Sequence, residues 1–222
     1  MSLGRRLVAE ALGTAFLLAT VIGSGIMGER LSGGDAAITL LANSLATGAA
    51  LAALIATFAP VSGAHFNPVV TLAFALEKTI TWRTASAYFG VQVAAAFAGV
   101  AIAHMMFGEP LFFASLKSRS GDAQWWSEIV ATFGLLTIIL GCVRYRPDAI
   151  PSAVGLYITA AYWFTSSTSF ANPAVTLARA ASNTFAGIRP DDVPGFIAAQ
   201  LVGALLAVAV TRWLHGGPAT KR

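Results

Sequence analysis

The chain has 222 residues, of which 56% are hydrophobic and only 11% carry a charge, and its mean hydropathy is +0.71. A soluble domain of this length could not bury so much apolar surface, so the composition excludes an ordinary water-soluble protein and indicates that much of the chain faces lipid. The formal net charge of +4 does not indicate a nucleic-acid partner, because the cations are scattered and mostly flank apolar segments.

Six apolar segments are long enough to cross a bilayer as helices, which takes about 20 residues each. We expect these spans at residues 5–27, 36–59, 82–107, 125–143, 150–165 and 191–215. The first segment is similar to a secretion signal, but it has no convincing small-residue cleavage site and it has a counterpart in the second half of the chain, so we interpret it as a true span. No segment shows the alternation of a barrel strand, so we predict an all-α membrane protein.

A short phrase occurs twice, each time between two of these spans. It reads Asn67-Pro68-Val69-Val70-Thr71-Leu72-Ala73 in the first copy and Asn172-Pro173-Ala174-Val175-Thr176-Leu177-Ala178 in the second. Asparagine followed by proline is a strong helix-start signal, because asparagine caps free backbone N–H groups and proline suits the first helical position. The apolar pieces 67–77 and 172–183 are too short to span, so we expect two half-helices. Broken helices at membrane depth are tolerated where they line a cavity or are buried in protein, which predicts a path through the membrane.

The two halves of the chain follow one plan. The segment 10–16, which opens with Glu10, resembles the segment 128–134, which opens with Glu128. A glutamine follows each Asn-Pro motif at a similar distance: these are Gln92 and Gln200. Each half therefore has two spans, a half-helix and a third span, and because three is an odd number the second half enters the membrane upside down. We predict a single domain over residues 1–222, built from inverted repeats of about 1–107 and 120–215, with the functional site near the midplane.

The distribution of cations predicts the orientation of the chain. With both termini in the cytoplasm, the inner side holds the larger set of lysines and arginines, which is the usual bias. This set is Arg5, Arg6, Lys78, Arg83, Arg144, Arg146, Arg212, Lys221 and Arg222, against Arg30, Lys117, Arg119, Arg179 and Arg189 on the outer side.

These features resemble the aquaporin and glycerol-facilitator family, the major intrinsic proteins, over almost the whole chain. The resemblance rests on both Asn-Pro motifs, the Ser62-to-Asn67 lead-in, the glutamate that opens each half, and the glycines Gly48, Gly155 and Gly203 at expected helix crossings. It implies six transmembrane helices and two re-entrant half-helices that meet at the centre, one pore per subunit, and a homotetramer. It also implies a passive channel in the lipid bilayer, here of the bacterial inner membrane, that needs no cofactor or metal.

Within such a pore, the half-helices would meet by their positive N-terminal ends, which disfavours a cation there. The pore motifs Asn67, Pro68, Val69 and Asn172, Pro173, Ala174 would supply amide N–H donors from the two asparagines. The extended stretches 61–66 and 165–171 can present backbone carbonyls as acceptors. A neutral solute with hydroxyl groups could exchange its water partners for these groups, whereas a bare ion could not.

The resemblance also implies a selectivity filter of four residues, one of which is usually an arginine directly after the second motif. This chain has Val175 at that position, as in bacterial aquaporins that admit arsenite. By the spacing of the family the other filter residues are Thr47, Tyr162 and Ser169, with Ala160 or Ala161 as alternatives to Tyr162. Replacing arginine by valine removes a fixed charge and considerable bulk. The departure favours uncharged solutes larger than water, such as glycerol, urea, and arsenous or boric acid, over the alternative of an ordinary water-selective channel.

Several polar residues near the expected pore have a functional and a structural interpretation. Arg179 either restores positive potential in the outer vestibule or extends to the outer surface. His65 either gates the inner vestibule with pH or holds its loop by a fixed hydrogen bond. Glu10 and Glu128 could form a proton relay, but their symmetric placement favours loop support, in which Gln92 and Gln200 would share.

Other classes of protein fit less well. The chain shows no cluster with metal-ligand spacing, no glycine-rich phosphate loop and no nucleophile with a nearby base, so we predict that it is not an enzyme. A secondary transporter is also built from inverted repeats, but it needs ionisable groups at the midplane beyond the two glutamates. A structural membrane protein with a closed pore remains the third alternative.

Overall fold

The computed structural model describes residues 1–217, which form a bundle of α-helices with no strand among them. The longer helices are α1 (Leu3–Leu31), α2 (Ala36–Ser62), α4 (Trp82–Phe107), α5 (Asp122–Tyr145) and α8 (Val193–His215). The shorter ones are α3 (Pro68–Leu76), α6 (Ile150–Phe164) and α7 (Pro173–Arg179), with 3-10 turns η1 (Pro147–Ala149) and η2 (Pro190–Asp192). The predicted all-α architecture is confirmed.

The six expected spans correspond to α1, α2, α4, α5, α6 and α8. Five of these helices are long and apolar enough to cross a membrane. The sixth, α6, has 15 residues and follows directly on η1. Both predicted half-helices are present, each beginning at the proline after an asparagine N-cap.

The second half-helix is shorter than the sequence indicates. We predicted it over 172–183, but α7 ends at Arg179. The backbone N–H of Ser115 donates to the carbonyl of Ala180 at 2.9 Å, and that of Phe113 donates to the carbonyl of Ala181 at 3.1 Å. The connection between α4 and α5 therefore takes up carbonyls beyond Arg179 in a pairing between distant parts of the chain.

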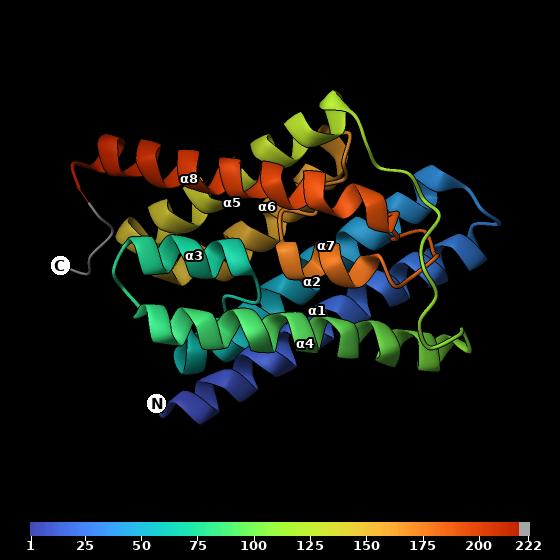
Figure 1. The fold of residues 1–222 in the computed structure, drawn as a ribbon, viewed down its shortest axis with the longest axis horizontal. Coiled ribbons are helices and arrows are strands. Elements are labelled where there is room, and N and C mark those ends of the chain that lie inside the picture. Colours follow the sequence, from blue (N-terminus) through green and yellow to red (C-terminus); the bar gives the residue numbers. More distant parts are fainter. Residues whose placement is uncertain (218–222) are drawn as a thin grey trace.

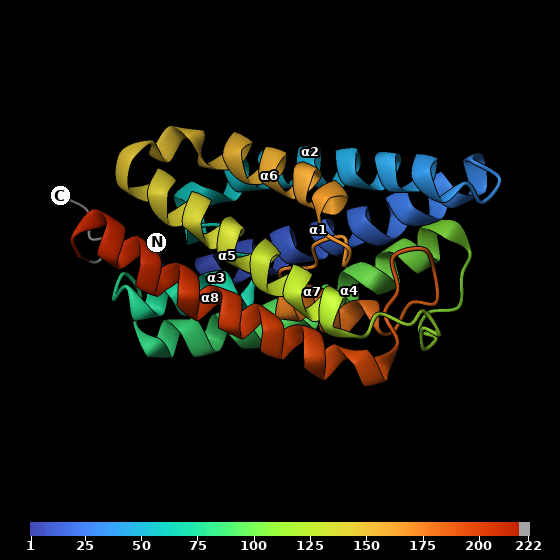
Figure 2. The ribbon, with the colours of Figure 1, turned by 90° about the horizontal axis from the view of Figure 1, so that it is seen from above.

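The helices pack in two similar groups, which meet along α2 and α6 (Figures 1 and 2). In one group α1 packs against α2 and α4, and in the other α5 packs against α6 and α8. The half-helices α3 and α7 lie between α4 and α8, following one another along the bundle (Figure 1). We call the end where α1 begins and α8 ends the termini end, and the opposite end, which holds the connections 108–121 and 180–192, the loop end.

Small residues let the helices approach closely. An added Cβ at Gly48 would lie 2.7 Å from the carbonyl oxygen of Gly155, and one at Gly155 would lie 2.5 Å from that of Gly48, so α2 and α6 touch backbone to backbone. Gly203 of α8 packs in the same way on the carbonyl of Ile129 in α5. Such small-residue contacts are the usual means of helix packing where lipid supplies no hydrophobic drive between helices.

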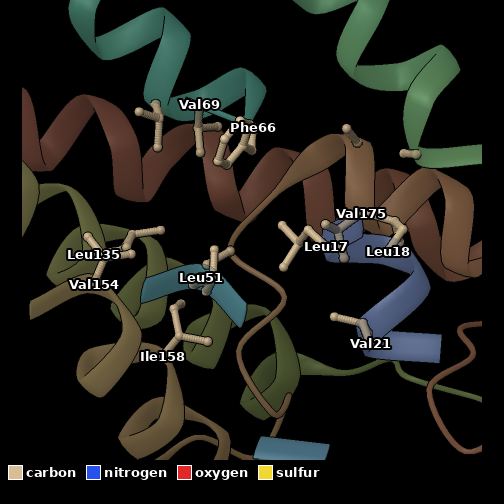
Figure 3. Packing of buried hydrophobic residues seen from close by; sticks show 14 of the residues in the cluster. Leu17, Leu18, Val21, Leu51, Phe66, Val69, Leu135, Val154, Ile158 and Val175 are labelled. Carbon is tan, nitrogen blue, oxygen red and sulfur yellow. The ribbon is translucent and has the colours of Figure 1, made fainter. Parts of the chain in front are cut away.

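The apolar core gathers around the inner ends of the half-helices (Figure 3). Side chains of α1, α2, α5 and α6 contribute, among them Leu17, Leu51, Leu135 and Ile158, each less than one-tenth exposed. The helices are thereby fixed around a shared interior, and part of that interior is not filled.

Candidate functional site: a cavity between two half-helices

The two Asn-Pro motifs bring the N-termini of α3 and α7 together. The side-chain oxygen of Asn67 accepts from the backbone N–H of Val69 at 3.0 Å, and that of Asn172 accepts from Ala174 at the same distance. Each amide group also donates across to the other loop, Asn67 to the carbonyl of Ala171 at 2.8 Å and Asn172 to that of Phe66 at 2.9 Å. These reciprocal bonds join the two halves at their centre and use one N–H of each amide.

Glu10 holds the loop that leads into α3. Its side chain is fully buried and its carboxylate accepts four hydrogen bonds. The donors are the Ser62 hydroxyl at 2.6 Å, the backbone N–H groups of His65 at 2.9 Å and Phe66 at 2.7 Å, and the Gln92 amide at 2.9 Å. A buried carboxylate with several charge-assisted bonds is a strong structural tie.

Glu128 repeats this arrangement for the loop that leads into α7, and it too is fully buried. It accepts from the Ser167 hydroxyl at 2.6 Å, from the backbone N–H groups of Phe170 and Ala171 at 2.8 Å each, and from the Gln200 amide at 2.6 Å. Both glutamates thus accept hydrogen bonds from backbone N–H groups, a serine and a glutamine. This is the geometry expected of residues that support the loops.

These ties hold the loops in an unusual backbone shape. Ala64 and Phe66 have φ of 51° and 49°, and Ser169 and Ala171 have φ of 50° and 47°. Residues other than glycine seldom adopt this left-handed region, and a structure that keeps them there must hold them from outside. The bonds from Glu10 and Glu128 to the adjacent N–H groups provide that restraint.

A cavity of about 370 Å³ runs beside the meeting point of the half-helices. Its wall includes apolar side chains of α1, α2, α5 and α6 together with both loops and both motif asparagines. At the termini end the lining includes Val143, Pro147 and Ile150, and at the loop end it includes Thr47 and Arg179. Because Asn67 and Asn172 line the cavity, their remaining N–H groups can serve a molecule inside it.

All four predicted filter residues line this cavity. The hydroxyls of Thr47 and Tyr162 lie 3.3 Å apart in a shared hydrogen bond. The Ser169 side chain is 3% exposed, and its oxygen has no hydrogen-bond partner. Val175 adds an aliphatic side chain to the same lining, and it lies near Leu17 and Leu18 (Figure 3). The alternatives to Tyr162, Ala160 and Ala161, do not line the cavity.

Arg179, the last residue of α7, is buried and lines the same cavity. Its side chain is 2% exposed, so it does not extend to the surface. Its Nε donates to the carbonyl of Ala186, and its guanidinium carbon lies 3.3 Å from the centre of the Phe170 ring. His65 lines the cavity from the other loop, where its Nδ1 pairs with the Thr71 hydroxyl at 3.0 Å and its ring contacts that of Phe74 in a tilted arrangement, with the ring centres 4.6 Å apart.

No sequence pattern indicates the role of Arg119, which lies in the connection between α4 and α5. Its guanidinium donates to the carbonyls of Gly187 at 2.8 Å and Ser167 at 3.1 Å, and its backbone N–H donates to Asp192 at 2.7 Å. It lies 4.9 Å from the ring of Phe170, and burial lowers its pKa to about 10. Arg119 therefore ties the loop-end connections to the segment that leads into α7.

A further cation, Lys117, lies close by. Its ammonium donates to the carbonyl of Phe185 at 2.7 Å. Burial, and then repulsion from Arg119 and Arg179, lower its pKa to about 8. In the sequence, Lys117 and Arg119 indicate only the topology of the chain, because nothing in a loop sequence shows which side chains fold inward. Residues 1–217 contain no cluster of potential metal ligands.

Comparison with known proteins gives consistent matches. The family described as major intrinsic protein matches residues 1–166. The chain is 58% identical to the aquaglyceroporin AqpS of Rhizobium meliloti over 96% of this chain and 91% of the relative. It is 36% identical to the aquaporin NIP1-4 of Oryza sativa subsp. japonica over 60% of this chain and 48% of that protein. The X-ray structure of the aquaglyceroporin from Plasmodium falciparum shares the fold, with a TM-score of 0.70, 21% identity and 96% of each chain covered.

Proposed function

Because the chain belongs to the major intrinsic protein family, whose members are passive membrane channels and not enzymes, we propose that it conducts small uncharged solutes larger than water. The candidates are glycerol, urea and neutral metalloid acids such as arsenous acid. The driving force is the concentration difference alone, and the protein supplies a low barrier and discrimination. The 58% identical relative is named an aquaglyceroporin, which supports a solute of this class.

The observation that carries the proposal is the composition of the cavity wall near the start of α7. Three hydroxyl-bearing side chains, Thr47, Tyr162 and Ser169, share this region with the aliphatic side chain of Val175. A mixed wall of this kind suits a solute with both hydroxyl groups and carbon, because each polar group lost from water finds a partner and the carbon skeleton meets an apolar surface.

We propose that the molecule is one domain of two inverted repeats, with the loop end outside and both termini in the cytoplasm of a bacterium, in its inner membrane. The distribution of cations supports this orientation; Lys221 and Arg222, which contribute to it, lie outside the described residues. The assembly that fits the family is a homotetramer with one pore in each subunit.

The test is a stopped-flow swelling panel on proteoliposomes with water, glycerol, urea and arsenous acid. We expect glycerol and urea to pass well above the rate of empty liposomes. In Val175→Arg, the added bulk and charge should lower glycerol flux at least about tenfold and leave water flux within about twofold. Val175→Ile, which keeps the aliphatic surface, is the matched control. Rapid water flux with no passage of any larger solute in the unmodified protein would indicate a water-selective channel and overturn the proposal.

A further inference from the structure

Arg179 has the environment of a group that meets the contents of the cavity. It is the one residue with a permanent charge among the lining residues, and no carboxylate pairs with it among the described residues. Burying a cation without a counter-ion costs free energy, so such a residue usually has a functional role. The Arg179 guanidinium is therefore the dominant charge that a permeating molecule encounters along this wall.

The position of the guanidinium is fixed from two sides. Nε donates to the carbonyl of Ala186, and the guanidinium carbon lies 3.3 Å from the centre of the Phe170 ring. Arginine commonly stacks on aromatic rings in this way. Neither Nη1 nor Nη2 has an acceptor among the described residues, so the outer N–H groups of the side chain remain available to a molecule in the cavity.

An independent observation comes from Ser169, on the loop before α7. Its hydroxyl oxygen is buried and has no partner, which is uncommon for a buried polar atom and calls for an explanation. Ser169 and Arg179 line the same cavity as the hydrogen-bonded pair Thr47 and Tyr162. The residues that carry one unsatisfied hydroxyl, two paired hydroxyls and a set of free N–H donors thus line the same cavity.

We infer that Arg179, Ser169 and Tyr162 form a solute-binding subsite at the loop end, which accepts neutral molecules with hydroxyl or carbonyl oxygens and rejects cations through the charge of Arg179. The inference rests on the proposed function and assigns to Arg179 the largest share of the charge discrimination at this end of the cavity. The oxygen of the solute accepts from the Arg179 Nη groups, and the Ser169 hydroxyl gains the partner it lacks. A cation gains nothing from the donors and is repelled at a short distance through a medium of low dielectric constant.

Urea and the guanidinium ion provide a test, because they have nearly the same planar shape and differ in charge. Uptake of both into proteoliposomes is measured for the unmodified protein and for Arg179→Gln, which keeps an amide donor but removes the charge. We expect the variant to pass urea within about threefold of the original rate and to raise guanidinium uptake at least about tenfold. Arg30→Gln is the matched control, because Arg30 is an exposed arginine at the same end, paired with Glu109, and its loss should change neither rate.

The outcomes separate the two proposals. If the unmodified protein passes urea but Arg179→Gln excludes guanidinium as well as before, the subsite is wrong and the channel function stands. If the unmodified protein passes no urea, glycerol or arsenous acid, the channel function itself fails. Should Arg179→Gln not reach the membrane, Phe170→Leu decides, since it removes the ring that positions the guanidinium and leaves the charge in the chain. A rise in guanidinium uptake in that variant supports the subsite, and an unchanged ratio of urea to guanidinium overturns it.

Discussion

The loop before α3 and the loop before α7 have the same support but line the cavity differently. In both, a buried glutamate accepts from a serine, two backbone N–H groups and a glutamine. Both glutamines also donate to a threonine in the half-helix that the loop leads into, at 3.0 Å to Thr71 and 2.9 Å to Thr176. The same set of hydrogen bonds occurs in both halves, and in both it holds a loop with left-handed backbone angles.

The side chains that face the cavity differ between the two ends. Counting from Asn67 and Asn172, the equivalents of Ser169, Val175 and Arg179 are Ala64, Val70 and Phe74. Counting from the touching glycines Gly48 and Gly155, Thr47 and Tyr162 correspond to Val154 and Ile55. All ten residues line the cavity. The five near the loop end carry three hydroxyls and a guanidinium, whereas their equivalents carry no polar group.

Even the aromatic contacts follow this division. The rings of His65 and Phe74 are in contact with their centres 4.6 Å apart, and at the equivalent positions the guanidinium carbon of Arg179 lies 3.3 Å from the centre of the Phe170 ring. The same packing position holds a ring in one half and a cation in the other. The residues that are alike in both halves therefore set the backbone of the pore. Discrimination between solutes is concentrated at the loop end, where the side chains differ from their equivalents in the other half.

We expect the largest effect from replacing the two buried glutamates, which tests whether they only support the loops. We expect Glu10→Gln and Glu128→Gln each to lower the free energy of unfolding by about 3 kcal/mol, because the amide that replaces one oxygen meets donors instead of an acceptor. Thermal unfolding in detergent measures the loss, and Glu109→Gln, at an exposed ion pair, is the control. Equal losses in the two halves fit the comparison; a stable variant with altered solute selectivity contradicts it.

We expect the glycine contact between α2 and α6 to lose stability equally when either glycine is replaced by alanine. We expect Gly48→Ala and Gly155→Ala each to cost about 2 kcal/mol, because the new Cβ would lie within 3.0 Å of a backbone oxygen of the other helix. Gly141→Ala in α5 meets nothing within 4 Å and should stabilise the helix by up to about 1 kcal/mol. The three melting temperatures check this, and a neutral effect at Gly155 would show that the helices can separate without loss.

We expect Arg119 to affect the discrimination between urea and guanidinium, because it holds the loop that leads into α7. Arg119→Gln removes its bonds to the carbonyls of Ser167 and Gly187, so we expect guanidinium uptake to rise about threefold while urea flux stays near its original rate. Arg119→Lys should restore part of the exclusion, because it keeps the charge but loses the fork of donors. A parallel fall of both fluxes would mean that Arg119 serves only the stability of the fold.

The smallest expected effect is a pH dependence from Lys117. Its neighbours are Arg119, Arg179 and Glu29, and its pKa of about 8 means that it loses its charge between pH 7 and pH 9. We expect guanidinium uptake to rise about twofold over this interval, because one repelling charge is removed. Lys117→Gln should show the higher rate at both pH values, and Lys117→Arg the lower one. A pH response that survives in both variants would assign it to another group.

The same shift has a defined sign for stability. Folding lowers the pKa of Lys117 from 10.5 to about 8, so between these values the unfolded chain binds more protons than the folded one. The contribution of Lys117 is therefore unfavourable below pH 8, and it diminishes as the pH rises through this window.

Much of the fold was predictable because its signals are local. Asparagine caps and adjacent prolines indicate the starts of α3 and α7, and long apolar runs indicate the spans. The end of α7 was not predictable, because it is set by pairing of Ala180 and Ala181 with the connection between α4 and α5, which lies far away in the sequence. The resemblance to the family implies the predicted filter positions, whereas Arg119 reaches the site only through the tertiary fold, and no pattern in residues 108–121 marks it.

The crossed amide bonds at the two motifs have a consequence for biosynthesis. Asn67 needs the carbonyl of Ala171, and Phe66 offers its own carbonyl to Asn172. When only helices α1 to α4 have been synthesised, the Asn67 amide and the Phe66 carbonyl lack these hydrogen-bond partners, in an environment poor in water. A product that ends after α4 would therefore leave the Asn67 amide and the Phe66 carbonyl without these partners at the centre of the bundle.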